Sequence, residues 1–129
     1  MAARSYRLPA ILIVEDEVLV RIDLADTIKD AGFLTFEAGG ADEAIRLMEA
    51  HPQIKVLFTD IDVPGTMDGL KLAHYVRSRW SPVLIVVTSG HFFPTLDQMP
   101  AESRFIAKPH KSSELRHLFR EIEDGFRNA

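Results

Sequence analysis

Three acidic residues, a threonine and a lysine each follow directly after an apolar run of the chain. They are Glu15, Asp16, Asp60, Thr88 and Lys108. Three neighbouring carboxylates repel one another unless a cation compensates them, and Mg²⁺ binds carboxylate and phosphate oxygens together. A lysine and a hydroxyl group suit the oxygens of a phosphoryl group in transfer. These residue types favour phosphoryl transfer, with Asp60 as the nucleophile that becomes an aspartyl phosphate.

Each of these features has a simpler explanation when it is taken alone. Glu15-Asp16-Glu17 could cap a helix and complement its dipole, and Thr88-Ser89-Gly90 could be a plain turn. Asp60 could merely end a strand, and Lys108 could be a solvated lysine. The simpler explanations leave unexplained why all four groups stand directly after apolar runs.

Apolar runs alternate with segments of helical periodicity along the whole chain. The expected strands are Ala10–Val14, Phe33–Glu37, the run Val56–Phe58 that leads to Asp60, Val83–Val87 and Arg104–Ala107. The expected helices follow Glu17 up to Gly32, cover Ala41–Ala50, run from about Asp68 to Arg79, and start at Ser112. Continuous apolar strands separated by helices predict an α/β fold, a doubly wound five-stranded parallel sheet with helices on both faces. The carboxyl ends of its strands share one edge, where ligands bind.

The composition predicts one ordinary globular domain. The chain has 129 residues, 47% of them hydrophobic and 26% charged, and a net charge of −4. Lysines and arginines are dispersed, and no apolar run approaches a membrane span, so we expect neither nucleic-acid nor membrane binding. The absence of cysteine fits a reducing compartment, and we expect a cytoplasmic protein. Residues 1–8 are expected to form a flexible tail, and residues 9–129 the domain.

From about Pro9 to Phe126 the chain resembles the receiver domain of bacterial two-component response regulators. The motifs that carry the resemblance are Val14-Glu15-Asp16-Glu17, Thr59-Asp60-Ile61-Asp62-Val63-Pro64, Asp68-Gly69, Val87-Thr88-Ser89-Gly90 and Lys108-Pro109. The resemblance implies a flavodoxin-like sheet of order 2-1-3-4-5. It also implies that Asp60 receives a phosphoryl group from a histidine kinase or a histidine phosphotransfer protein, and that the protein signals to a downstream target.

By the same resemblance, Glu15, Asp16 and Asp60 hold Mg²⁺ together with the backbone carbonyl of Asp62. Thr88 and Phe105 form the switch pair, and the Lys108-Pro109 peptide bond is cis. The implied protein is not an ordinary enzyme but a phosphoacceptor that assists its own phosphorylation and dephosphorylation. Its length suggests a stand-alone receiver, a monomer or a weak homodimer.

Three features depart from the family pattern. The loop after Pro64 is one residue longer than usual, and His110 stands where the family usually has an aromatic residue. Pro94 and Pro100 interrupt the segment 91–103, so the fourth helix should be short or irregular.

An apolar set on the first helix is expected to be exposed and to form a docking patch for the phosphodonor. Its members are Val18, Ile22 and Ala25.

Two other functions compete with this interpretation. Asp60-Ile61-Asp62-Val63 also fits the nucleophile motif of haloacid-dehalogenase-type phosphatases, although in that family the second acidic pair follows the lysine. A receiver-like binding module that is never phosphorylated is the other alternative. Loss of an acid, the threonine or the lysine would be its signature, and all of them are present.

Overall fold

The computed structural model describes residues 8–128. Within this range five strands and four α-helices alternate, and one short 3₁₀ helix, η1, precedes the last strand. The strands are β1 (Ala10–Val14), β2 (Leu34–Ala38), β3 (Ile54–Asp60), β4 (Leu84–Ser89) and β5 (Ser103–Ala107). The helices are α1 (Val18–Asp30), α2 (Ala41–Ala50), α3 (Gly69–Arg79), η1 (Leu96–Gln98) and α4 (Ser112–Arg127).

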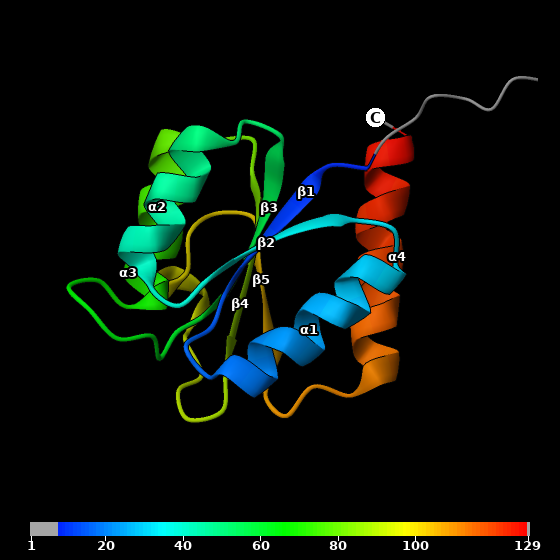
Figure 1. Ribbon diagram of the computed structural model, residues 1–129. Helices are drawn as coiled ribbons and strands as arrows, with labels where there is room; N and C mark the ends of the chain where they lie inside the picture. The colour runs from blue at the N-terminus through cyan, green and yellow to red at the C-terminus, as the bar shows by residue number, and fades with distance from the viewer. Residues whose placement is uncertain (1–7, 129) are drawn as a thin grey trace, which may run out of the picture.

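All strand pairs are parallel, and the sheet has the order β2-β1-β3-β4-β5. Helices α2 and α3 cover one face and α1 and α4 the other, as Figure 1 shows. The doubly wound fold with order 2-1-3-4-5 is therefore confirmed. Because all strands run the same way, their carboxyl ends meet at one edge, the lower edge of the sheet in Figure 1.

Alternate residues of each central strand enter the core on opposite faces of the sheet. Leu12 and Leu57 pack under α2 and α3, whereas Ile13 and Phe58 pack under α1 and α4. The central strands are thus buried on both sides, which explains their continuous apolar runs. This burial fixes the register of β1, β3 and β4 and holds their polar ends in place.

The boundaries agree with the sequence-based prediction to within one or two residues. Strand β2 begins and ends one residue later than predicted, and α1 ends before Gly32, whose φ of +97° is one that glycine adopts without strain. The segment between β4 and β5 contains only η1, as its two prolines led us to expect. Of the predicted tail 1–8, residues 1–7 lie outside the described residues.

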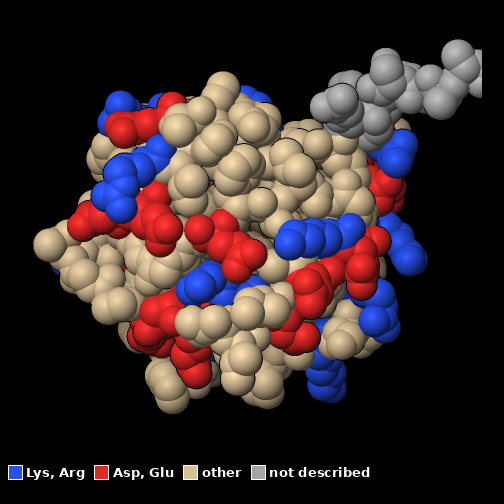
Figure 2. All heavy atoms as spheres, viewed as in Figure 1, with Lys and Arg blue, Asp and Glu red and all other residues tan. Residues whose placement is uncertain are grey.

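The surface carries both signs of charge. On the face seen in Figure 2, acidic and basic groups are interspersed and form no continuous basic stripe. Within residues 8–128, no helix is long and apolar enough to cross a membrane.

Candidate functional site

The sheet brings the predicted site residues together at the carboxyl edge. Asp60 is the last residue of β3 and pairs in register with Thr88 of β4. Glu15 and Asp16 follow β1, which flanks β3 on its other side, and Lys108 follows β5. Residues separated by up to 93 positions in the sequence thus share one site.

Lys108 lies between two of the acids. Its Nζ atom donates hydrogen bonds to Glu15 Oε1 at 2.7 Å and to Asp60 Oδ2 at 2.9 Å. Burial acts to lower the pKa of Lys108, but the hydrogen bonds to Glu15 and Asp60 outweigh it, so the pKa is raised. Lys108 is therefore a fixed positive charge beside Asp60. The prediction that lysine and acids converge is confirmed.

The three acids form a cluster that could hold a metal ion. One carboxylate oxygen from each of Glu15, Asp16 and Asp60 lies within 4.8 Å of the other two. Glu15 and Asp60 are buried, while Asp16 is exposed and forms no hydrogen bond or ion pair with any described residue. Burial raises the pKa of Glu15, although Lys108 and the Glu17 amide act in the opposite direction. The three carboxylates carry more negative charge than Lys108 neutralises. Oxygen donors of this kind suit a hard divalent cation.

The acids after β1 do not serve as a helix cap. Glu17 occupies the N-cap position of α1 without a capping hydrogen bond from its side chain. Instead, Arg21 donates from Nη1 to the backbone carbonyl of Glu15 at 2.8 Å and pairs through Nε with Glu37 at 3.2 Å. Sequence reasoning missed Arg21, which fixes the backbone that carries the first acid.

The loop that carries Asp62 is held by two further contacts. The Asp62 amide donates to Asp60 Oδ1 at 3.2 Å, and the buried Ser89 hydroxyl donates to Asp62 Oδ2 at 3.1 Å. Ser89 Oγ also accepts the amides of His91 and Phe92, so it ties the ends of β3 and β4 together. The sequence-based prediction placed Ser89 only in a turn. Its position directly after Thr88 was the signal that could have indicated a role at the site.

Gly69 is another residue whose role sequence reasoning missed. A Cβ atom there would lie 1.8 Å from the backbone oxygen of Asp60 and 2.8 Å from the Cα atom of Ile61. Helix α3 therefore starts in direct contact with the peptide group between Asp60 and Ile61. Asp68 caps this helix by accepting the Lys71 amide at 2.8 Å.

The two predicted switch residues have different surroundings. The Thr88 hydroxyl is hydrogen-bonded to Nε2 of His110 at 2.8 Å and is buried. Phe105 is half-buried, and its ring meets that of Phe93 edge-on, with centroids 5.7 Å apart. The Lys108-Pro109 bond is cis, as predicted.

A hollow of about 310 Å³ opens over the acid cluster, and Asp16, Asp60 and Lys108 are among its lining residues. Beside it, α1 exposes Val18 (54%) and Ile22 (47%), as predicted. The prediction for Ala25 was wrong. This residue is buried in the core with Leu118 and Phe119 of α4, and Leu19 (83% exposed) extends the surface instead.

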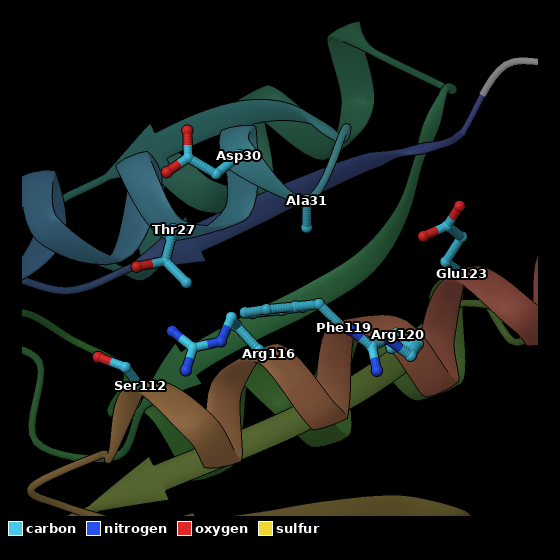
Figure 3. A pocket seen from close by; sticks show the side chains of 8 residues that line it. All are labelled: Thr27, Asp30, Ala31, Ser112, Arg116, Phe119, Arg120 and Glu123. Carbon is cyan, nitrogen blue, oxygen red and sulfur yellow. The ribbon is translucent and has the colours of Figure 1, made fainter.

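A second cleft, of about 360 Å³, lies between α1 and α4. Figure 3 shows Thr27 of α1 and Ala31, directly after α1, facing Arg116 of α4 across it, with the Asp30 carboxylate directed away from α4. None of the predicted site residues lines this cleft. The predicted site residues therefore lie apart from this cleft, at the acidic edge of the sheet.

The fold and the site together define a doubly wound α/β domain that carries an acid cluster and a paired lysine at the carboxyl edge of its parallel sheet. Comparison with known proteins gives the family. Residues 11–120 match the family model described as the response regulator receiver domain. The chain belongs to this family, and its homologues include named response regulators of two-component systems.

The relatives support this assignment over different lengths. The transcriptional regulatory protein PdtaR of Mycobacterium tuberculosis is 35% identical over 80 residues, which cover 61% of this chain and 38% of that protein. The chain thus matches well under half the length of this relative. The receiver domain of NtrX from Brucella abortus is 29% identical, with a TM-score of 0.74, over 86% of this chain and 95% of that one. A CheY-like receiver domain from Methanospirillum hungatei shares the fold, with a TM-score of 0.80 at 20% identity, over 94% and 98% of the two chains.

Proposed function

We propose that Asp60 accepts a phosphoryl group from a histidine kinase or a histidine phosphotransfer protein in two-component signalling. The observation that carries the proposal is the placement of a buried Asp60 carboxylate against Lys108, with two further acids close by. Family membership supports the same reaction class.

In the proposed step, a carboxylate oxygen of Asp60 attacks the phosphorus atom of a phosphohistidine. The new P–O bond forms as the P–N bond breaks, and the imidazole leaves, so that Asp60 becomes an acyl phosphate. Lys108, which contacts both Asp60 and Glu15, would neutralise charge on the phosphoryl oxygens. The chain assists this transfer and the later hydrolysis of the acyl phosphate, in which water takes the phosphoryl group and the Asp60 carboxylate is regenerated, rather than turning over a substrate.

Glu15, Asp16 and Asp60, with the backbone carbonyl of Asp62, would hold Mg²⁺. The bound ion supplies positive charge that offsets the carboxylates and the phosphoryl group, which itself carries about −1.5 to −2 charges. The donor set fits this requirement because it consists of oxygens and keeps one acid, Asp16, unpaired among the described residues.

Modification of Asp60 would be read out by Thr88 and Phe105. Thr88 is the β4 partner of Asp60 in the β3–β4 pair, and its hydroxyl would donate to a phosphoryl oxygen. Phe105 lies one position before Ile106, the β5 partner of Thr88, and faces Phe93 of the irregular segment. A downstream protein would sense the change on this side of the domain.

The donor would dock on α1 beside the site, where Val18, Leu19 and Ile22 are exposed. Such an apolar surface next to a reaction centre suits the helices of a kinase or phosphotransfer protein. We further propose a cytoplasmic protein that acts as a monomer or weak homodimer, without nucleic-acid or membrane binding.

Intact-mass spectrometry after incubation with acetyl phosphate and Mg²⁺ tests the proposal. The wild type should gain one phosphoryl group and Asp60→Asn none. Asp97→Asn, which changes an exposed acid on η1, serves as the matched control and should label like the wild type. Labelling that persists in Asp60→Asn would move the site elsewhere, and an unlabelled wild type would favour a binding module.

Steady hydrolysis of a phosphomonoester would favour the phosphatase alternative. That alternative requires a second acidic pair beyond the lysine. The acids that lie beside Asp60 here come instead from the end of β1.

A further inference from the structure

His110 engages the hydroxyl group on which the proposed switch depends. Nε2 of His110 lies 2.8 Å from Thr88 Oγ1, and no second hydrogen bond of this hydroxyl is found among the described residues. Thr88 is 2% exposed, so its hydroxyl depends on protein partners rather than on bulk water. In the unmodified protein, the Thr88 side chain is therefore committed to His110.

The surroundings of His110 favour a neutral ring. The imidazole is half-buried and meets the Phe58 ring edge-on, with centroids 5.7 Å apart. Burial is the main cause that lowers the pKa of His110, and the charge of Lys108 adds to it, against smaller opposing effects of Glu114 and Asp60. A neutral imidazole has one donor and one acceptor nitrogen. With Nε2 as the acceptor, the single hydrogen of the Thr88 hydroxyl is used in the bond to His110.

The packing role of residue 110 does not require a histidine. An edge-on contact with Phe58 is equally available to a phenylalanine or tyrosine ring. A phenylalanine has no group that could accept a hydrogen bond from Thr88. The functional difference made by His110 is therefore the hydrogen bond.

We propose that His110 is a positioning residue that holds the Thr88 hydroxyl in the unmodified state and so opposes the switch. The inference rests on the proposed phosphoacceptor function of Asp60. For Thr88 to donate to a phosphoryl oxygen, it must first give up its bond to His110, and the half-buried imidazole then lacks that partner. A net neutral hydrogen bond corresponds to roughly a two- to tenfold shift in an equilibrium.

Beryllofluoride with Mg²⁺, a non-covalent mimic of the phosphoryl group, allows the test. Its dissociation constant would be measured for the wild type, His110→Phe, Thr88→Val and the double variant. We expect His110→Phe to tighten binding two- to tenfold, and to have no such effect when Thr88 is already valine. Affinity for Mg²⁺ alone should be the same in the wild type and in His110→Phe.

A matched control is His117→Phe, which makes the same exchange at an exposed histidine of α4 that pairs with Glu121. It should leave beryllofluoride binding unchanged. Unchanged or weaker binding in His110→Phe, or an equal gain in the Thr88→Val background, would show that His110 only packs against Phe58 and would overturn the inference.

The state of His110 in the unmodified protein is tested independently by ¹⁵N NMR of its ring. We expect Nε2 to be the unprotonated nitrogen and its chemical shift to change in Thr88→Val. A protonated Nε2 in the wild type would refute the inference even if Asp60 is phosphorylated. Failure of the wild type to bind beryllofluoride and to label with acetyl phosphate would instead refute the proposed function.

Discussion

Replacing Gly69 by alanine should disturb the peptide that follows Asp60. The added Cβ atom would lie 1.8 Å from the Asp60 carbonyl oxygen and 2.6 Å from its carbonyl carbon. Both are backbone atoms, so no side chain can move aside to make room. The start of α3 or the end of β3 must shift until the distance rises from 1.8 Å to at least 3.4 Å, where ordinary contacts begin.

The expected loss of stability follows from two opposing effects. Overpacking of a well-packed site costs about 1–3 kcal/mol, and a shift imposed on backbone belongs at the upper end of that range. The lower conformational entropy of the unfolded alanine chain offsets about 0.4–1 kcal/mol of this loss. We expect Gly69→Ala to lower the free energy of unfolding by about 2 kcal/mol, which corresponds to a decrease in Tm of roughly 6–10 °C.

Urea denaturation measures this change, with the m-value expected to be the same in the wild type and the variants. Gly125→Ala provides the control. Gly125 lies in α4, and a Cβ atom there would meet nothing within 4 Å. The same chemical change at this position should raise the free energy of unfolding by about 0.5–1 kcal/mol. Acetyl-phosphate labelling of Asp60 should slow in Gly69→Ala and not in Gly125→Ala. If Gly69→Ala is as stable and as reactive as the wild type, the contact between α3 and Asp60 does not have the role described.

Three further perturbations test other parts of the site. Lys108→Met leaves two buried carboxylates without their cation and should destabilise the protein by about 1–3 kcal/mol in a chelating buffer. Mg²⁺ should restore part of this stability. If chemical denaturation shows a loss that does not depend on Mg²⁺, the acid cluster does not bind the ion as described. Val18→Glu should slow phosphotransfer from the cognate kinase without changing Mg²⁺ affinity. Leu34→Glu, at an exposed apolar residue of β2, should leave the rate of phosphotransfer unchanged. Equal rates in the two variants would contradict the proposed docking surface. The pKa of His110 lies below its ordinary value of 6.5, so the unfolded chain binds the proton first as the pH falls. The wild type should therefore lose stability relative to His110→Phe below about pH 6.5. Free energies of unfolding that change equally in the two proteins from about pH 7 to 5 would exclude this.

The sequence was sufficient to predict where the chemistry lies because the site uses strand ends. Apolar runs located β1, β3 and β4, and a parallel sheet leaves little freedom in where Glu15, Asp60 and Thr88 then meet. The irregular connection between β4 and β5 was also predictable, because Pro94 and Pro100 prevent a regular helix whatever surrounds them.

Other features depend on packing between distant elements and left no local signal. Val18 and Ala25 lie on nearly the same side of α1, yet Val18 is exposed near the start of the helix while Ala25 packs against residues of α4. The need for glycine at position 69 arises only where α3 contacts the end of β3. The partner of His110 could not be predicted either, because His110 lies in the loop between β5 and α4 and the path of a loop is not set by strand ends.

The central claim is that one cation-dependent pocket activates Asp60. The most direct test is the initial rate of acetyl-phosphate labelling of the wild-type protein as the Mg²⁺ concentration is raised from zero in chelator-treated buffer. A saturable increase from a negligible rate, absent in Asp60→Asn, is the predicted result. A labelling rate independent of Mg²⁺ would contradict the account.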